Sequence, residues 1–519
     1  MNLGSLITRS ARFWGDQLAV KDERKSLTYR ELDQRSNQLA NALQSLELFP
    51  GDRVGVLAWN RAEIIEVEVA LYKGGFVRAP INARLSDTEA VHVCNDAQAQ
   101  VLIVDPEHLD AAKLALDSSD SVRRILVMGD SDLVDPKDSY EQTLTAASSE
   151  TVAEEMEPED LAVLHYTSGS SGVLKAAMQT VGNRHSVLQK LIYRGQLHAD
   201  SQEICIHVGP ITHASGMSIM PLLSQGHCNL LMSRFDADDF LATVEREQAT
   251  QTYLVPTMIN RILSSPNRDR YDISSLKMIR YGAAPISPAR LKEAIEFFGP
   301  ILNQGYGAGE TCSSVCVLTE ADHASALNGH PERLSSCGRP LFATEVKIVD
   351  DAGVELPVGE AGEMVIRGPD VMKGYWNAPD LTEEVLKDGY YHTGDIAYAD
   401  EQGYLFIIDR KKDMIVAGGF NVYPNEVENA LYQHPDVFEA CVVGAPDPDM
   451  GESVKAVVVL KPGAKTSAES LINHCAELLG RFKKPNSVEF ESELPKNGNG
   501  KIQRREVRDR YWQNSERKV

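Results

Sequence analysis

Short apolar segments that end in glycine-rich or polar turns recur along the sequence, and they constrain its fold more than any other feature. Between residues 161 and 400 they include LAVLHY, EICIHVGP, CNLLMS, TYLVPT, KMIRYGAA and ILNQGYG. In residues 1–160, similar segments alternate with stretches of helical periodicity such as LTYRELDQRSNQLANALQSL, for which Thr28 is the predicted N-cap. Because such alternation builds parallel sheets covered by helices, the sequence predicts an α/β fold with ligand sites at the carboxyl ends of strands.

The chain is too long for a single hydrophobic core. It has 519 residues, whereas single cores stop growing near roughly 250–300 residues. After residue 340, segments such as EVKIVDDAGVELPVGEAGEMVIRG predict β-hairpins, and a smaller α/β unit follows from about Asp413. We therefore expect a large N-terminal domain of parallel or mixed sheets with helices, a β-rich subdomain, and a small C-terminal α/β domain.

Composition argues against several classes of protein. The net charge of -23, from 52 basic and 75 acidic residues, is the opposite of what a nucleic-acid binder usually carries. No apolar run approaches the roughly 18 residues that a membrane helix needs, and the N-terminus lacks a signal-peptide pattern, so we expect a cytoplasmic protein without a membrane span. The eight cysteines form no CxxC pair and are expected to be reduced, mostly buried thiols.

The segment HYTSGSSGVLKAAMQT has the composition of an anion-binding loop. From Thr167 to Gly172 it contains only Thr, Ser and Gly, and Lys175 follows. Successive backbone N–H groups in such a turn form a concavity for an anion, and glycines allow a close approach of the backbone. The GxxGxxK spacing differs from the GxxxxGK[ST] of P-loops, and a flexible linker is the alternative interpretation of any Gly/Ser run.

Four further segments favour the anion-binding loop over the linker. They are RYGAAPIS, NQGYGAGET, YHTGDIAYADEQGYLFIIDRKKDMIVAGGFNVYPNEVENAL and LPKNGNGKIQRREVR. Together with the Gly/Ser loop, and in this order, they resemble the adenylate-forming superfamily of acyl-CoA synthetases, adenylation domains and beetle luciferases over nearly the whole chain. The resemblance implies an acid-thiol ligase: a carboxylic acid reacts with ATP, with Mg²⁺ present, to give an acyl-adenylate, and the acyl group then passes to coenzyme A.

The resemblance also implies roles for individual residues. Lys501 matches the lysine that reaches the carboxylate and α-phosphate, Glu310 the magnesium ligand, and His213 the gate between the acyl pocket and the thiol channel. The expected ATP/AMP contacts are Thr167, Ser168, Gly169, Ser170, Ser171, Gly172 and Lys175 for the phosphates; Gly282, Ala283, Ala284 and Tyr306 for adenine; Asp395 and Arg410 for the ribose; and, without a more specific role, Gln304, Gly305 and Gly307.

The same resemblance implies an acyl pocket and a mobile domain. The pocket would be formed by His213, Ala214, Ser215, Gly216, Tyr253 and Gly282. Lys412 aligns with the hinge of the superfamily, which divides the chain into an N-terminal domain, residues 1–411, and a mobile C-terminal domain, residues 412–519. Gly418 and Gly419 would border the channel for the pantetheine of coenzyme A, where residues without side chains leave room.

The chain departs from the superfamily pattern at four positions around the phosphates. Leu174 replaces a proline, Ala176 a glycine, Val181 a histidine, and Gly309 a threonine whose hydroxyl serves the α-phosphate; Thr311, two residues later, is expected to point elsewhere. An alternative is therefore a ligase with weak or absent adenylation that makes thioesters from a supplied acyl-adenylate. Further alternatives are a stand-alone adenylation enzyme that loads a carrier protein, a non-catalytic acyl or nucleotide binder, and a luciferase-type oxygenase.

Overall fold

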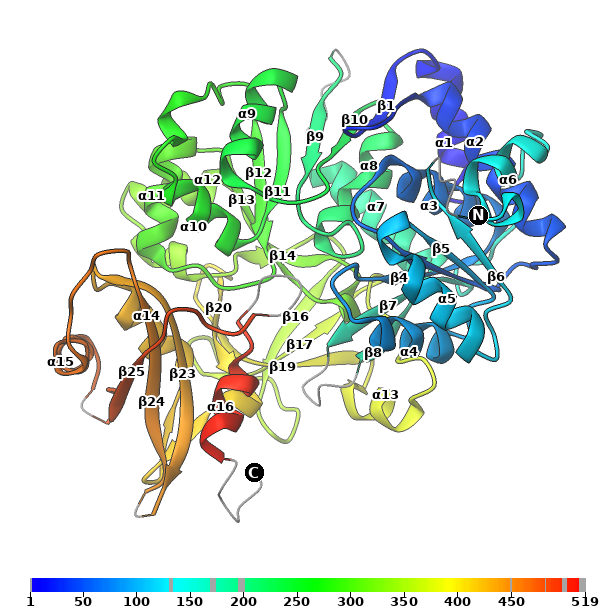
Figure 1. Ribbon diagram of the computed structural model, residues 1–519. Coiled ribbons are helices and arrows are strands. Elements are labelled where there is room, and N and C mark those ends of the chain that lie inside the picture. Colours follow the sequence, from blue (N-terminus) through cyan, green and yellow to red (C-terminus); the bar gives the residue numbers. More distant parts are fainter. Residues whose placement is uncertain are drawn as a thin grey trace.

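The β-strands of the protein form four sheets in the computed structural model, which describes residues 2–129, 134–168, 174–194, 201–448, 450–480, 482–496 and 502–512 (Figure 1). Two large sheets belong to the N-terminal part of the chain. A β-rich sheet follows them in sequence, and the last sheet belongs to the C-terminal α/β unit. The predicted α/β fold with a β-rich subdomain and a small C-terminal unit is thus confirmed.

The first large sheet has six strands. In order they are β6 (Arg124–Val127), β5 (Val101–Val104), β3 (Arg53–Leu57), β4 (Val77–Ile81), β7 (Leu161–Ser168) and β8 (Leu174–Thr180). All neighbours are parallel except β7 and β8, which form an antiparallel pair in which Thr167 lies opposite Lys175. The Gly/Ser segment therefore connects the two strands of a hairpin.

The second large sheet has nine strands. In order they are β15 (Arg339–Pro340), β14 (Ser314–Leu318), β13 (Leu302–Gly307), β12 (Met278–Gly282), β11 (Gln251–Leu254), β9 (Ile204–His207), β10 (Cys228–Leu231), β1 (Leu18–Lys21) and β2 (Ser26–Thr28). The six strands from β13 to β1 in this order are parallel to one another, whereas β14 and β2 run antiparallel to the strands beside them, β13 and β1. The segments that follow β9, β11, β12 and β13 consequently leave the sheet at one edge, as the sequence pattern predicts.

Helices cover both large sheets. Those of the first 200 residues are α1 (Ser5–Trp14), α2 (Tyr29–Ser45), α3 (Ala62–Gly74), α4 (Asp87–Ala97), α5 (Leu109–Ser118), α6 (Tyr140–Ala146) and α7 (Val181–Arg194); those that follow are α8 (Ile219–Leu223), α9 (Ala237–Glu247), α10 (Pro256–Ser264), α11 (Pro288–Phe298) and α12 (Glu320–Leu327). The predicted N-cap is confirmed, because Thr28 accepts from the backbone of Glu31 and the Glu31 side chain accepts from the backbone of Thr28. This reciprocal capping box satisfies two backbone donors that the first turn of α2 would otherwise leave unpaired.

The β-rich sheet and the C-terminal unit are mainly antiparallel. The former contains β16 (Glu345–Val349), β17 (Gly362–Arg367), β19 (Tyr390–Ala399), β18 (Leu386–Lys387) and β20 (Leu405–Arg410), with α13 (Pro379–Val385) beside it. The latter contains β22 (Phe420–Val422), β21 (Ile415–Ala417), β24 (Gly451–Leu460), β23 (Val437–Asp447) and β25 (Ser487–Phe490), with α14 (Pro424–Tyr432), α15 (Ala468–Leu478) and α16 (Arg504–Trp512). Helix α16 packs on β23 through Val507, Cys441 and Val443.

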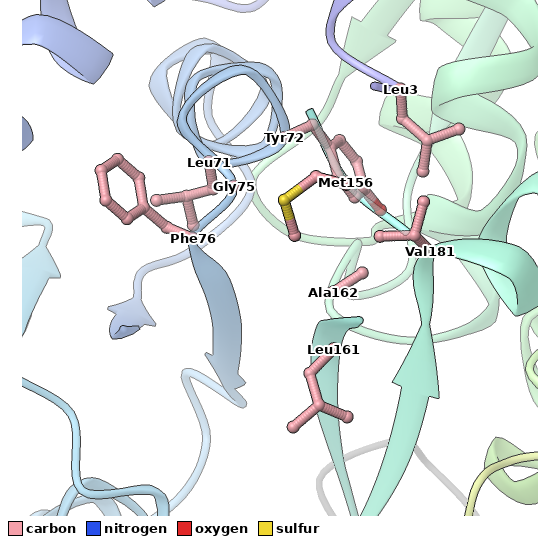
Figure 2. Close-up of a pocket in the computed structure, with 9 residues that line it drawn as sticks. All are labelled: Leu3, Leu71, Tyr72, Gly75, Phe76, Met156, Leu161, Ala162 and Val181. Atoms are coloured by element: carbon pink, nitrogen blue, oxygen red, sulfur yellow. The ribbon is translucent and has the colours of Figure 1, made fainter. Parts of the chain in front are cut away.

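A small apolar cavity lies at the carboxyl end of α3 (Figure 2). Its lining is Leu3, Leu71, Tyr72, Gly75, Phe76, Met156, Leu161, Ala162 and Val181. The one polar group among these side chains, the hydroxyl of Tyr72, already accepts a hydrogen bond from Arg184 Nε at 3.0 Å. The cavity therefore offers a ligand no free polar group and is a feature of core packing.

Two further expectations concern the whole chain. All eight cysteines are buried and unpaired, as predicted. Among the residues that the structure describes, no helix combines the length and the apolar character needed to cross a bilayer.

Candidate active site

A polar cavity opens where β13 of the nine-stranded sheet meets the β-rich sheet. It is lined by Tyr306, Gly307, Ala308, Thr311, Ile366, Tyr391, Thr393, Asp395 and Arg410. Four of these residues, Tyr306, Gly307, Asp395 and Arg410, are among the predicted nucleotide contacts. They come from distant parts of the sequence: Tyr306 and Asp395 are 89 positions apart.

Asp395 is the buried carboxylate of this cavity. It is 4 % exposed, and the Tyr306 hydroxyl donates to its Oδ2 at 2.5 Å while Arg410 Nε lies 2.6 Å from its Oδ1. Burial and the neighbouring carboxylate raise the pKa of Tyr306 well above its ordinary value, so the phenol keeps its proton and acts as a donor. Because each carboxylate oxygen can accept more than one hydrogen bond, Asp395 retains capacity for a vicinal diol such as that of ribose.

The ends of β12 and β13 approach each other closely. A Cβ at Gly282 would lie 2.3 Å from the carbonyl oxygen of Gly305, its register partner, so no other residue fits there without displacing backbone. Ala283 has a φ of 67°, in the left-handed region that non-glycine residues rarely adopt. Gln304 accepts a hydrogen bond from the Tyr281 hydroxyl at 3.1 Å. The residues at this strand end are small, and their contact with adenine remains a prediction.

Glu310 is the buried carboxylate at the start of the loop after β13. It lies in the 3-10 helix η5 (Gly309–Thr311) and is 9 % exposed. The Tyr375 hydroxyl donates to its Oε1 at 2.7 Å, and Thr167 Oγ1 is 3.5 Å from the same oxygen. Lys175 Nζ lies 5.6 Å from the centre of the Tyr375 ring. Tyr375 thus connects two predicted site residues; it stands in the segment MKGYWNAP, which carries no motif from which this role is apparent.

The hydroxyl of Thr311 is used within its own loop. Its Oγ1 accepts from the Ala308 backbone N–H at 2.9 Å and donates toward the carbonyl oxygen of Ser313 at 2.9 Å. Thr311 is fully buried. Its hydroxyl therefore cannot replace the one that Gly309 lacks, in agreement with the expectation from the sequence.

Some of the predicted phosphate contacts lie outside the described residues. These are Gly169, Ser170, Ser171 and Gly172 of the Gly/Ser loop, together with Lys501. Of Ser168 the structure describes the backbone, in β7. The described ends of the loop, Thr167 and Lys175, are opposite each other in the hairpin and reach Glu310 and Tyr375 respectively.

A pair of histidines lies next to this region. His213 precedes the 3-10 helix η3 (Ala214–Ser218), and its Nδ1 is 2.8 Å from Thr212 Oγ1. Its ring meets the ring of His165 edge to face, with centroids 5.2 Å apart. Burial, followed by the charge of Arg84, lowers the pKa of His213 to about 4, so its imidazole is neutral at pH 7. His165 is not among the predicted site residues, although it begins the HYTSG segment.

The residues after His213 are held by their backbone. A Cβ at Gly216 would lie 2.0 Å from the carbonyl oxygen of Ile211, so the turn requires glycine. The Ser215 carbonyl lies 2.8 Å from His207 Nδ1, whereas its buried Oγ has no hydrogen-bond partner among the described residues. Tyr253, on β11, places its hydroxyl 3.3 Å from the Cβ position of Gly282. The predicted acyl-pocket residues are thus distributed over the carboxyl ends of β9, β11 and β12.

The predicted hinge lies in a segment that contacts both parts of the chain. Lys412 is in the 3-10 helix η7 (Lys411–Asp413), and burial lowers its pKa. Asp409, which precedes it, accepts from the backbone N–H of Asn425 at 2.8 Å and lies 3.5 Å from Arg504. Contacts therefore cross the expected domain boundary.

The turn between β21 and β22 requires the two glycines predicted to border the thiol channel. Gly418 and Gly419 have φ values of 57° and 83°. The next residue, Phe420, is exposed and contacts the ring of Phe482, with centroids 5.0 Å apart.

A buried carboxylate beside the β7–β8 hairpin, a buried aspartate in a small polar cavity and a small-residue strand end are the features expected of a nucleotide-binding enzyme of α/β fold. Residues 7–376 match the family described as AMP-binding enzyme, and residues 426–501 match the AMP-binding enzyme C-terminal domain. The protein belongs to the AMP-binding, adenylate-forming enzyme family.

Comparisons with individual proteins agree with this assignment. The chain is 39 % identical to feruloyl-CoA synthase of Amycolatopsis over 512 residues, which cover 98 % of this chain and 99 % of the relative. It is 34 % identical to a medium/long-chain-fatty-acid–CoA ligase of Mycobacterium tuberculosis, with 95 % and 87 % covered. An anthranilate CoA ligase in complex with anthranoyl-AMP superposes with a TM-score of 0.90 at 26 % identity, with 98 % and 97 % covered.

The predicted class of enzyme is confirmed by these findings. The chain is an AMP-forming acid-thiol ligase, an acyl-CoA ligase that works through an acyl-adenylate. The enzyme binds ATP or AMP, and coenzyme A is a substrate.

Proposed function

We propose that this ligase performs both half-reactions and that its acid is an aryl acid with a polar ring substituent. In the first step, a carboxylate oxygen attacks the α-phosphorus of ATP, the bond to the β-phosphate oxygen breaks, and pyrophosphate leaves. In the second step, the sulfur of coenzyme A attacks the acyl carbon, a C–S bond forms, AMP leaves, and the thiol proton passes to solvent.

The proposal of an active first step rests on the segment from Tyr306 to Glu310. This segment lines the polar cavity at one end and contacts the β7–β8 hairpin at the other. The adenosine would occupy the cavity beside Asp395, and the phosphates would extend past Glu310 toward the Gly/Ser loop. Like charges at about 4 Å repel by roughly 4 kcal/mol at an effective dielectric near 20, so the approach of carboxylate to phosphate needs cations. Lys175 and Lys501 are the proposed protein cations.

Glu310 is the proposed magnesium ligand. A single buried carboxylate suits Mg²⁺, which usually takes one or two protein carboxylates and completes its shell with phosphate oxygens and water. Among the described residues no group of three or more His, Cys, Asp or Glu side chains forms a dedicated metal site. When bound, the ion would neutralise charge on the phosphates.

The aryl acid is supported by similarity and by the buried hydroxyl of Ser215. The relative with 39 % identity over nearly the full length is named for ferulate, and the structural neighbour holds an anthranoyl group. In this chain, the buried Ser215 Oγ has no hydrogen-bond partner among the described residues, and Ser215 Cβ and Met258 Cε lie 3.5 and 3.9 Å from the Cβ position of Gly209. A buried polar group without a partner costs about 1–3 kcal/mol, which a hydroxyl on the substrate ring would offset and an alkyl chain would not.

The test compares acids under both half-reactions. Wild-type protein is assayed with ferulate, 4-hydroxycinnamate, cinnamate, anthranilate and dodecanoate for acid-dependent ATP–pyrophosphate exchange, and for AMP release that depends on coenzyme A or on an acyl carrier protein. We expect exchange and CoA-dependent release with the hydroxylated aryl acids, both abolished by chelation of Mg²⁺. A preference for dodecanoate would refute an aryl acid as the substrate. Thioester formation from synthetic acyl-AMP without ATP–pyrophosphate exchange would refute an active adenylation step. AMP release that depends on the carrier protein would refute coenzyme A as the acceptor.

A variant of Ser215 tests the proposed polar contact. Ser215→Ala should lower kcat/KM for 4-hydroxycinnamate about tenfold, the effect of one hydrogen bond, and leave kcat/KM for cinnamate unchanged. Equal effects on the two acids would contradict the assignment.

A further inference from the structure

The side chain of His165 occupies the space that a side chain at position 309 would need. A Cβ built on Gly309 would lie 2.6 Å from His165 Cδ2, 3.3 Å from His165 Nε2 and 2.6 Å from Thr167 Cγ2. Contacts below 3.0 Å are not tolerated without movement, so the imidazole and any larger residue at 309 exclude each other. The glycine that replaces the superfamily threonine is thus paired with a histidine that fills the vacated volume.

This shared volume lies between the proposed adenosine cavity and the phosphate loop. Gly307 and Ala308 line the cavity, Gly309 follows them, and Glu310 is next, 3.5 Å from Thr167 at the start of the Gly/Ser loop. The α-phosphate is bonded directly to the ribose, and the other phosphates extend from it toward the loop. A nucleotide in this cavity must therefore pass its α-phosphate close to Gly309 and the Nε2 edge of His165.

The His165 ring is available to such a ligand. It is 6 % exposed, and no described residue forms a hydrogen bond with either ring nitrogen. Burial, followed by the proximity of His213, Arg184 and Arg78, lowers the pKa of His165 well below its ordinary value. The neutral ring still carries one N–H donor. A ligand oxygen at this place would give that N–H a hydrogen-bond partner.

We propose that His165 donates a hydrogen bond from Nε2–H to a non-bridging oxygen of the α-phosphate and so replaces the threonine hydroxyl that is missing at position 309. The inference deepens the proposed function, since it assumes that this cavity binds the nucleotide that is adenylated. No proton is transferred, and the donor adds no charge to the site. His213, whose ring packs edge to face against His165, keeps the imidazole in place.

Binding of AMP tests the contact without using an acid. Wild type, His165→Leu and His165→Gln are titrated with AMP and with adenosine, which lacks the phosphate, by isothermal titration calorimetry. A hydrogen bond to a charged group predicts a loss of AMP affinity of about 10- to 100-fold in His165→Leu, with adenosine affinity within twofold of wild type. His165→Gln keeps a donor N–H and should recover most of the AMP affinity. Equal AMP affinity in all three proteins, or an equal loss for adenosine, would overturn the proposal.

Exchange of the two side chains tests the shared volume. Gly309→Thr alone should lower AMP affinity and the melting temperature, because the threonine overlaps the imidazole. Because a Cβ at position 309 would also lie 2.6 Å from Thr167 Cγ2, the exchange is made in a Thr167→Ser background, which removes that methyl group. In this background, His165→Ala with Gly309→Thr should bind AMP at least tenfold more tightly than His165→Ala, since the added threonine places a hydroxyl next to the phosphate. A tolerated Gly309→Thr, or no gain from Gly309→Thr in the His165→Ala protein, would overturn the inference.

The acid-activation assays and the AMP-binding assays can refute the proposed function and the His165 contact independently of each other. If the wild type binds AMP through His165 but activates none of the acids, the proposed acid class and first step are wrong and the contact stands. If the wild type activates aryl acids and His165→Leu binds AMP as the wild type does, the contact is wrong and the proposed function stands.

Discussion

Replacement of Arg504 by methionine is expected to loosen the C-terminal unit where it joins the rest of the chain. Arg504 Nη2 lies 2.9 Å from both carboxylate oxygens of Glu428 and donates to Asn425 Oδ1 at 3.0 Å. Its Nη1 lies 3.2 Å from Asp413 Oδ2 and 3.5 Å from Asp409 Oδ1. One guanidinium thereby ties helix α16, which begins three residues after Lys501 in the sequence, to α14 and to the end of β20.

The magnitude follows from what remains after the substitution. Removal of one partner of a buried ion pair costs about 3–5 kcal/mol, because the other charge stays buried. Here Asp409 still accepts from the backbone N–H of Asn425 at 2.8 Å and of Arg410 at 2.7 Å, and Glu428 still accepts from that of Val442 at 2.7 Å. We therefore expect the lower part of that range, about 3 kcal/mol. This corresponds to roughly a hundredfold change in the equilibrium between the folded and the locally unfolded C-terminal unit.

The stability lost in Arg504→Met should increase with pH. Burial raises the pKa of Asp409 to about 6 in the presence of Arg504, against about 3.9 in an unfolded chain. The folded protein thus binds more protons than the unfolded one between these values, and the free energy of unfolding falls as pH rises through this window. Without the guanidinium the folded pKa rises further and the window extends upward, so Arg504→Met should cost more at pH 8 than at pH 5.

Hydrogen exchange followed by mass spectrometry measures the effect locally. Peptides from α14, β23 and α16 should exchange about a hundredfold faster in Arg504→Met, while peptides of the six-stranded sheet keep their protection. The control is Arg510→Met on the same helix, which removes two ion pairs that are more exposed, with Glu491 at 2.7 Å and with Glu506 at 3.8 Å, and should cost under about 1 kcal/mol. Equal protection in the two variants, or a loss that does not depend on pH, would refute the reasoning.

Two further predictions concern the polar cavity and the histidine pair. Asp395→Asn removes the charge that holds Tyr306 and Arg410, and it should weaken AMP binding, measured by calorimetry, about 10- to 100-fold. The control Asp380→Asn, at an exposed carboxylate, should bind AMP as the wild type does. Unchanged AMP affinity in Asp395→Asn would exclude the ribose contact. His213 has its pKa lowered by burial to about 4, against about 6.5 unfolded, so the unfolded chain binds more protons in this window and stability falls as the pH drops through it, by up to about 3 kcal/mol. His213→Gln should therefore show a flatter dependence of the melting temperature on pH between 6.5 and 4.5, and parallel profiles for the two proteins would contradict the burial argument.

The fold class and the enzyme class were predictable because their signals are contiguous in sequence. Alternation of strands and helices, the switch to hairpins after residue 340, and each superfamily segment can be recognised in one window of residues. The N-cap at Thr28 is equally local, since the capping box depends on residues three positions apart. The site residues assigned by position, including Lys501 and Lys412, remain predictions.

The tertiary structure decided which side chains compensate for one another. The contact between Tyr375 and Glu310 joins residues 65 positions apart, and Arg504 meets Asp409 across 95 positions. From the sequence, Gly309 reads as a lost hydroxyl in the phosphate half of the site. Only the packing of β7 against the loop after β13 places the His165 ring in that space, because steric exclusion acts between atoms that the fold, and not the order of residues, brings together.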